Sequence, residues 1–243
     1  MSEEIKFPIR INRYLELQGV ATRKGADVLI EQGLVWVNGQ KAVLGYKVRK
    51  GDRVEVSPVA SGGRKKFVYF AYHKPRGLAT EDIKNKLPVS AGDVFPLGRL
   101  DKESEGLILL TNDGRVTDRL LNPKYAHEKI YEVEVREKVS PMHKKILEGG
   151  VTYHEANPHG LYRQTKSLKL KAKGVEILDS HRLAITLTEG KKHEIRRMLA
   201  GAHLTVVSLK RVQIMNIKLG SLASSKTREL KGQELKEFLA MLY

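Results

Sequence analysis

The sequence predicts an α+β protein, in which a small unit of two helices and a hairpin precedes a domain built on a mixed, largely antiparallel sheet. Two patterns support this fold class. Residues 8–56 combine two short helical segments with an Asn-Gly turn, and from residue 67 onward period-two strand patterns alternate with short helical ones. Residues 57–66 are small, Gly-rich and then basic, which is typical of a linker. We therefore expect a linker at 57–66 between domains at 8–56 and 67–243.

Two helix starts are expected in the first domain. Asn12 is suited to cap a short helix that carries Leu15 and Leu17. Thr22 is suited to cap a second helix, which Gly33 ends. Residues 35–42 then predict a hairpin, because its Asn-Gly dipeptide readily adopts the positive φ angles of a type I′ turn. A last strand is expected at 53–56.

The second domain is expected to contain several strands and three helices. Ser140 followed by Pro141 predicts a helix start, since Ser is a good cap and Pro fits the first position. Residues 193–199 predict a short helix, and an amphipathic helix ends the chain. Strand patterns occupy residues 67–73, 107–110, 129–135, 167–173 and 182–187.

The amino-acid composition limits the classes of function that are possible. The 243 residues carry a formal net charge of +16, which favours a polyanionic partner, and nucleic acid fits best. The chain has no cysteine, which excludes disulfides, thiolate catalysis and thiolate-bound zinc. No apolar run reaches the roughly 20 residues that span a bilayer, and the acidic N-terminus lacks the apolar core of a signal peptide. We expect a cytoplasmic protein that does not bind membranes.

The run from Gly98 to Gly114 is the strongest candidate for chemistry. It places Asp101 at the edge between an apolar segment and a loop, and Arg99 lies two residues before it on the same side. In isolation, Asp101 could simply cap a turn or pair with Arg99. No spacing suggests a metal site, a Ser-His-Asp triad or a phosphate-binding glycine loop, so we expect no metal. A lone carboxylate is the natural candidate for a catalytic group.

This run resembles the signature of the ribosomal RNA pseudouridine synthases. Residues 8–56 resemble the RNA-binding module named after ribosomal small-subunit protein four, which some members carry. The resemblance implies a pseudouridine-synthase-type catalytic domain with Asp101 as the nucleophile on a flipped-out uridine. It also implies that the partner is ribosomal RNA, and it leaves open whether transfer RNA is a substrate too. Because the isomerisation gains no atom and moves no electrons overall, no cofactor is expected.

The same resemblance assigns roles to further residues. Tyr131 matches the active-site tyrosine, which stacks on uracil, although a Tyr in an alternating strand is more often a core residue. Arg196 matches the arginine that pairs with Asp101 and keeps it ionised. Arg99 matches the arginine that fills the space left by the flipped base; a phosphate contact or an ion pair is the alternative. His193 lies near this machinery, but the family does not use it as a base.

Other positions are candidates for RNA contact. The segment 73–77 resembles a family motif that shapes the loop behind the catalytic Asp, and Leu209 is the candidate for an apolar wall beside the uracil. The remaining substrate-binding candidates are the cations Lys74, Lys192, Arg197 and Arg211. The helix face of the first domain offers Arg10, Asn12, Arg13, Arg23 and Lys24, unless these are ordinary solvated charges. Two of these cations start a helix, where the macrodipole disfavours positive charge.

Two other functions remain open at this point. A non-catalytic RNA-binding factor of ribosome assembly would use the same basic surface, but it would have no need of Asp101 amid phosphate contacts. A base-removing glycosylase would also flip a nucleotide and use a carboxylate. Residues 127–129 and 214–216 resemble the family members that act on large-subunit RNA, which slightly favours this substrate. We expect a monomer, because the long C-terminal amphipathic helix is needed for the core.

Overall fold

The computed structural model describes residues 6–57, 67–87, 94–155 and 166–243. The predicted linker at 57–66 lies outside the described residues except for Ser57. Contacts divide the chain into two units. The first comprises Met1–Val68 with Asn112–Asp118, and the second comprises Tyr69–Thr111 with Arg119–Tyr243.

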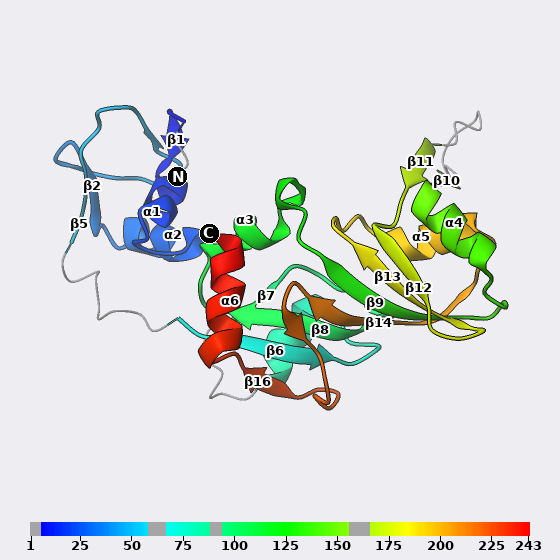
Figure 1. The fold of residues 1–243 in the computed structure, drawn as a ribbon. Coiled ribbons are helices and arrows are strands. Elements are labelled where there is room, and N and C mark those ends of the chain that lie inside the picture. Colours follow the sequence, from blue (N-terminus) through cyan, green and yellow to red (C-terminus); the bar gives the residue numbers. More distant parts are fainter. Residues whose placement is uncertain (1–5, 58–66, 88–93, 156–165) are drawn as a thin grey trace. The chain divides into compact units, whose positions relative to one another are not determined.

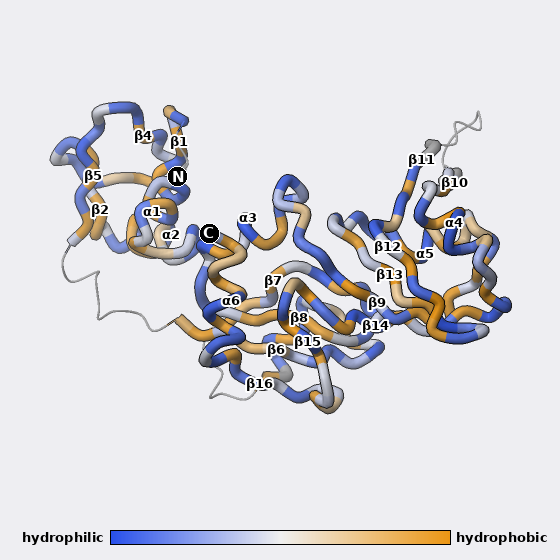
Figure 2. The backbone as a smooth tube through the Cα atoms, in the orientation of Figure 1, coloured by the Kyte–Doolittle hydropathy of each residue, from blue (hydrophilic) through white to orange (hydrophobic). Residues whose placement is uncertain are grey.

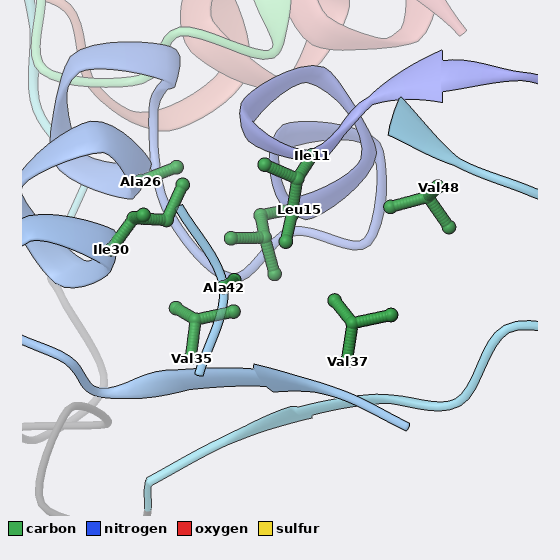
Figure 3. Close-up of a cluster of buried hydrophobic side chains, with 8 residues drawn as sticks. All are labelled: Ile11, Leu15, Ala26, Ile30, Val35, Val37, Ala42 and Val48. Atoms are coloured by element: carbon green, nitrogen blue, oxygen red, sulfur yellow. The ribbon is translucent and has the colours of Figure 1, made fainter. Parts of the chain in front are cut away.

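The first unit packs two helices against short strands (Figure 1). In chain order its elements are β1 (Ile9–Arg10), α1 (Ile11–Leu17), α2 (Arg23–Glu31), β2 (Val35–Val37), β3 (Gln40–Lys41), β4 (Lys47–Val48) and β5 (Val54–Val56). Strands β3, β2 and β5 form one antiparallel sheet, and β1 pairs with β4. Between the helices and the strands lies a core of Ile11, Leu15, Ala26, Ile30, Val35, Val37, Ala42 and Val48 (Figure 3).

Local signals in this unit are mostly confirmed. Thr22 caps α2, with its side chain accepting a hydrogen bond from the Gly25 N–H at 3.1 Å. Asn38 and Gly39 have φ angles of 51° and 81°, as the predicted hairpin turn requires. The prediction that Asn12 caps α1 is wrong, because the helix begins at Ile11 with Arg10 at the cap position, so Asn12 lies inside the first turn.

The second unit is built on a nine-stranded sheet in the order β12-β13-β9-β14-β8-β6-β16, with β15 paired to β14 and β7 to β8. Its strands are β6 (Tyr69–Lys74), β7 (Phe95–Leu97), β8 (Glu105–Thr111), β9 (Lys129–Val135), β12 (Gly174–Ile177), β13 (Arg182–Leu187), β14 (Val206–Ile214), β15 (Ile217–Lys218) and β16 (Thr227–Glu229). Among the described pairings only β14 with β8 is parallel. The predicted α+β class with a largely antiparallel sheet is confirmed.

The remaining described elements are helices and one hairpin. They are η2 (Thr80–Lys86), α3 (Val116–Leu121), η4 (Pro123–Tyr125), α4 (Pro141–Gly149), α5 (Glu194–Gly201), α6 (Gly232–Leu242) and the hairpin of β10 (Val151–Glu155) with β11 (Lys166–Leu170). Helix α3 begins in the segment that belongs to the first unit. Ser140 starts α4 with a capping box, as its sequence predicts. Helix α6 packs on β6, where the Phe238 ring meets Tyr69 edge-on at 6.4 Å.

None of the helices in the described ranges is both long enough and apolar enough to cross a membrane.

The parallel pair of strands determines where the site forms. Strand β8 is buried along almost its whole length, and Figure 2 shows its apolar character. At its start, Gly106 lies opposite Arg211 of β14 and adopts a φ of +110°. A Cβ at Gly106 would lie 2.3 Å from the Arg211 carbonyl oxygen, so only glycine permits this approach. The loop that precedes β8, residues 98–104, is thereby held against the centre of the sheet.

Candidate active site

A cleft of about 1070 Å³ opens in the second unit, and six segments line it. They are residues 79–81, the segment 97–104 before β8, residues 120–123, the start of β9, the segment 187–196 that leads into α5, and residues 209–214 of β14. The predicted residues that line this cleft are Arg99, Asp101, Tyr131, Lys192, Arg196, Leu209 and Arg211. The structure therefore brings residues from widely separated motifs into one cavity, which is the usual form of a small-molecule or nucleotide site.

A buried threonine fixes the loop that carries Asp101. The Thr80 hydroxyl donates to the Leu100 carbonyl at 2.8 Å and accepts from the Leu100 N–H at 3.1 Å. Beyond the carboxylate, the Ser104 N–H donates to the Asp101 carbonyl at 3.0 Å. Leu100 itself is buried, so the backbone is anchored immediately before and after Asp101. Three hydrogen bonds to the backbone of residues 100 and 101 therefore fix the position of Asp101 at the cleft.

Lys74 does not contact solvent, which contradicts its predicted role in RNA binding. Its side chain is fully buried, and Nζ donates to the carbonyls of Pro75 at 3.0 Å, Leu78 at 2.6 Å and Lys102 at 3.4 Å. Burial lowers the pKa of this lysine to about 8, although the nearby Asp101 carboxylate opposes the shift. Lys74 thus links the loop 75–78 to the loop that carries Asp101, which matches the loop-shaping role that the resemblance gives to its motif.

Arg211 is also corrected from an RNA contact to a buried structural group. Only 4% of the residue is exposed, and its Nε donates to the Leu107 carbonyl at 2.7 Å. Its Nη1 reaches the Arg99 carbonyl at 3.4 Å, and the guanidinium lies 6.0 Å from the centre of the Tyr131 ring. A phosphate has little access to a guanidinium in this position. Arg211 instead ties β14 to the backbone on both sides of Asp101.

The expected ion pair between Arg196 and Asp101 is absent from the described residues. Nη2 of Arg196 donates instead to the Glu103 carbonyl at 3.2 Å, in the loop that carries the carboxylate. The partner of Asp101 is His193, whose Nε2 lies 3.6 Å from Oδ1. His193 occupies the cap position of α5 with a φ of 53°, and this left-handed backbone places its ring at the carboxylate.

Two apolar walls of the cleft lie on the central strands. Tyr131 of β9 and Leu209 of β14 are 7% and 5% exposed, and both border the cavity. Tyr131 lies directly opposite Arg211 in the β9–β14 register. Tyr131 and Leu209 therefore lie where the sequence predicts an aromatic and an aliphatic surface for a base.

Cations at the rim differ in what they contact. Arg99 is largely exposed, and its Nη2 pairs with Glu81 at 2.7 Å. Lys192 is exposed and borders the cleft. Arg197, which was also expected to touch RNA, is half-buried and is not among the residues that line the cavity.

Sequence reasoning missed two titratable residues of the cleft. Lys129 is largely enclosed, and burial together with the Arg211 charge lowers its pKa. Glu194 is 4% exposed, and burial raises its pKa to about 7. Lys129 could have been found, because it precedes Tyr131 by two residues and so faces the same side of the strand. Glu194 has no comparable signal, since its burial depends on how the loop before α5 folds.

In the first unit, the predicted RNA-binding side chains form two groups. Arg10 and Lys24 are exposed. Arg13 and Arg23 both pair with Glu16, and Asn12 donates to Asp27 at 2.9 Å. The Arg23–Glu16 and Asn12–Asp27 contacts join α1 to α2, whereas the Arg13–Glu16 pair lies within α1, so part of the predicted face also holds the two helices together.

Comparison with known proteins defines the class of this chain as an RNA-modifying enzyme. A model of the RNA pseudouridylate synthase family matches residues 68–201, and a model of the S4 domain matches residues 9–54. A crystal structure of a pseudouridylate synthase superposes with a TM-score of 0.66 at 25% identity, covering 97% of this chain and 100% of that one.

Curated relatives agree with the family model. The chain is 33% identical to the dual-specificity RNA pseudouridine synthase RluF of Escherichia coli strain K12, over 96% of this chain and 79% of that protein. It is also 33% identical to the ribosomal large subunit pseudouridine synthase B of Bacillus subtilis strain 168, over 96% of both chains. The chain belongs to the RNA pseudouridylate synthase family.

Proposed function

We propose that this protein isomerises a specific uridine of ribosomal RNA to pseudouridine, with Asp101 as the nucleophile. The observation that carries the proposal is the anchored Asp101 loop at the cleft of a pseudouridylate synthase fold. Large-subunit RNA is the favoured substrate, because the Bacillus subtilis relative is named for the large subunit and aligns over 96% of both chains. Transfer RNA is the second candidate, and the Escherichia coli relative is named as dual-specificity.

The chemistry suits a lone carboxylate. The reaction detaches uracil from its ribose, rotates it and rejoins it through carbon, so no atom is gained. An ionised Asp101 can attack the ribose carbon or assist removal of a ribose proton. The target nucleotide must leave its stack to reach the cleft, at a cost of a few kcal/mol. Tyr131 and Leu209 then offer faces against which the extruded base packs, and Arg99 is the candidate to occupy the space that it leaves.

The residues around Asp101 have two further roles, which are holding the loop that carries it and binding RNA. Arg211 holds the loop backbone at the Arg99 carbonyl, Lys74 holds it at the Lys102 carbonyl, and Arg196 binds it through the Glu103 carbonyl. Lys192 at the rim is a candidate phosphate contact. In the first unit, the exposed Arg10 and Lys24 are candidate phosphate contacts, and Arg13 and Arg23 are further candidates although each pairs with Glu16. We propose a cytoplasmic monomer for this function.

The test is base-resolution mapping of pseudouridine in ribosomal and transfer RNA from cells that lack this protein. The same cells are complemented with wild type or with Asp101→Asn. We expect one site to vanish and only wild type to restore it. Restoration by Asp101→Asn would remove Asp101 as the nucleophile. If no site changes in either RNA class, a non-catalytic RNA-binding role becomes the better account.

A further inference from the structure

His193 is the side chain that meets the Asp101 carboxylate. Its Nε2 lies 3.6 Å from Oδ1, and its side chain is 46% exposed towards the cleft that it lines. Its φ of 53° is unusual for a residue other than glycine, and such backbone conformations cluster at functional sites. The cap position of α5 thus presents an imidazole to the carboxylate, although the family resemblance gives His193 no role as a base.

The reaction requires a proton acceptor close to Asp101. When the N1–C1′ bond has broken and C5 has bonded to C1′, C5 carries both the ribose and its original hydrogen. The C5–H bond must then break: its electron pair restores the C5=C6 double bond, the proton goes to a base, and N1 takes up a proton. Because C5 is now bonded to C1′, and Asp101 acts at or beside that ribose carbon, the base must lie within a few ångströms of that carboxylate.

We infer that Nε2 of His193 accepts the C5 proton and that the resulting imidazolium returns a proton to N1 directly or through water. This inference rests on the proposed function. A neutral imidazole is the side chain best suited to take and release a proton near neutral pH. The half-exposed ring can also exchange that proton with solvent.

Other groups near the carboxylate are less suited to this step. Arg196 is a permanent cation whose Nη2 is engaged with the Glu103 carbonyl. Lys129 is enclosed, and its Nζ donates to the His127 carbonyl at 3.2 Å. Tyr131 is the competing candidate, because its hydroxyl could also move a proton. A useful experiment must therefore separate His193 from Tyr131 and a chemical role from an RNA contact.

The experiment compares wild type, His193→Gln and Tyr131→Phe in single turnovers at saturating RNA. The substrate fragment carries uridine, 5-deuteriouridine or 5-fluorouridine at the target position. His203→Gln is the matched control: His203 also has a left-handed backbone, with a φ of 59°, but it follows α5 and does not line the cleft. Imidazole rescue of His193→Gly provides a second readout, since glycine tolerates the same backbone conformation.

We expect His193→Gln to slow conversion of uridine by about 10²-fold, the usual scale of a lost general base. Conversion of 5-deuteriouridine should become slower still, which reveals C5–H cleavage as the limiting step. Consumption of 5-fluorouridine should proceed at the wild-type rate, because a C5 that bears fluorine has no proton to lose. His203→Gln should behave as wild type, and imidazole should restore turnover to His193→Gly.

Three results would overturn the inference. Equal slowing on all three substrates without an isotope effect would make His193 a positioning or RNA-binding residue. An isotope effect in Tyr131→Phe but not in His193→Gln would assign the base to the tyrosine. Full activity of His193→Gln would remove the residue from the mechanism. Failure of wild type to convert any uridine would instead overturn the proposed function, so the two failures are distinguishable.

Discussion

Among the described residues, both units of this protein expose cations, but only the second unit also buries them. In the first unit, Arg10 and Lys24 stand at the surface, and Arg13 and Arg23 share a carboxylate. In the second unit, Lys74 and Arg211 are buried and bind backbone carbonyls. Surface cations attract RNA additively and are individually dispensable, whereas a buried cation with two or three committed donors fixes the geometry of a loop.

This difference implies an uneven response to substitution. Changes in the cleft should affect folding or turnover strongly, while single changes on the first unit should shift affinity slightly. Four substitutions test the contrast, in order of the effect that we expect.

Gly106→Ala should have the largest effect. The added Cβ would lie 2.3 Å and 2.6 Å from the backbone oxygen and nitrogen of Arg211, at a φ of +110°. Backbone must therefore move between β8 and β14, and we expect a loss of at least about 3 kcal/mol in the free energy of unfolding. Urea denaturation measures it. Gly149→Ala is the control, because no described atom beyond its chain neighbours and its own helix backbone lies within 4 Å of its Cβ position, and its effect should stay within about 1 kcal/mol. Equal effects would refute the close approach.

Thr80→Val should separate loop geometry from RNA binding. Valine keeps the shape of the side chain but leaves the buried N–H and carbonyl of Leu100 unpaired, which costs about 1–3 kcal/mol. We expect the single-turnover rate to fall by up to about 10²-fold with little change in RNA affinity. Thr80→Ser retains the hydroxyl and should recover most of the rate. If the rate of Thr80→Val equals that of wild type, the hydrogen bonds between Thr80 and Leu100 do not position Asp101.

Glu194→Gln tests the buried carboxyl of the cleft through pH. The folded-state pKa of about 7 lies above the ordinary value of 4.5, so the folded protein holds the extra proton between these values. The associated stability is present below pH 4.5 and is lost as pH rises through 7. Wild type should therefore lose on the order of 2 kcal/mol relative to Glu194→Gln between pH 5 and 8. Parallel urea midpoints for both proteins, with the exposed Glu176→Gln as control, would reveal a flat difference if the carboxyl is not perturbed.

Lys24→Ala should have the smallest effect. Removing one phosphate contact lowers the slope of log K against log salt by about 1 and weakens binding a few-fold. The single-turnover rate at saturating RNA should not change. Lys236→Ala, an exposed lysine of α6, serves as the control in the same fluorescence titrations. An unchanged slope for Lys24→Ala would remove this residue from the RNA-binding face.

Much of this fold could be predicted because its signals are local. Thr22, the Asn38-Gly39 turn and Ser140 act through their own neighbours in sequence, and each is found where the pattern predicts. Asn12 shows the limit of such signals, because a cap position depends on where the preceding strand stops. Boundaries of elements follow from tertiary packing as much as from residue preference.

The cleft was predictable only in part. Motifs placed Asp101, Tyr131 and Leu209 at one cavity. Strand alternation fixes which face Tyr131 and Leu209 occupy, whereas Asp101 lies in the loop before β8. Sequence could not show that Lys74 and Arg211 point inwards, because a lysine or an arginine in a basic chain is indistinguishable from a phosphate contact until its burial is known. The partner of Asp101 likewise depends on the backbone of His193, a conformation that sequence does not reveal.

The central claim is that the first unit binds RNA while Asp101 performs the chemistry. Its most direct test is a single-turnover assay of Asp101→Asn on a ribosomal RNA fragment, with the dissociation constant measured on the same RNA. Glu103→Gln, a neighbouring exposed carboxylate of the same loop, is the control. We predict wild-type affinity with a rate reduced by on the order of 10³-fold or more for Asp101→Asn, and a near-normal rate for Glu103→Gln. Turnover by Asp101→Asn at a rate close to wild type would contradict this account.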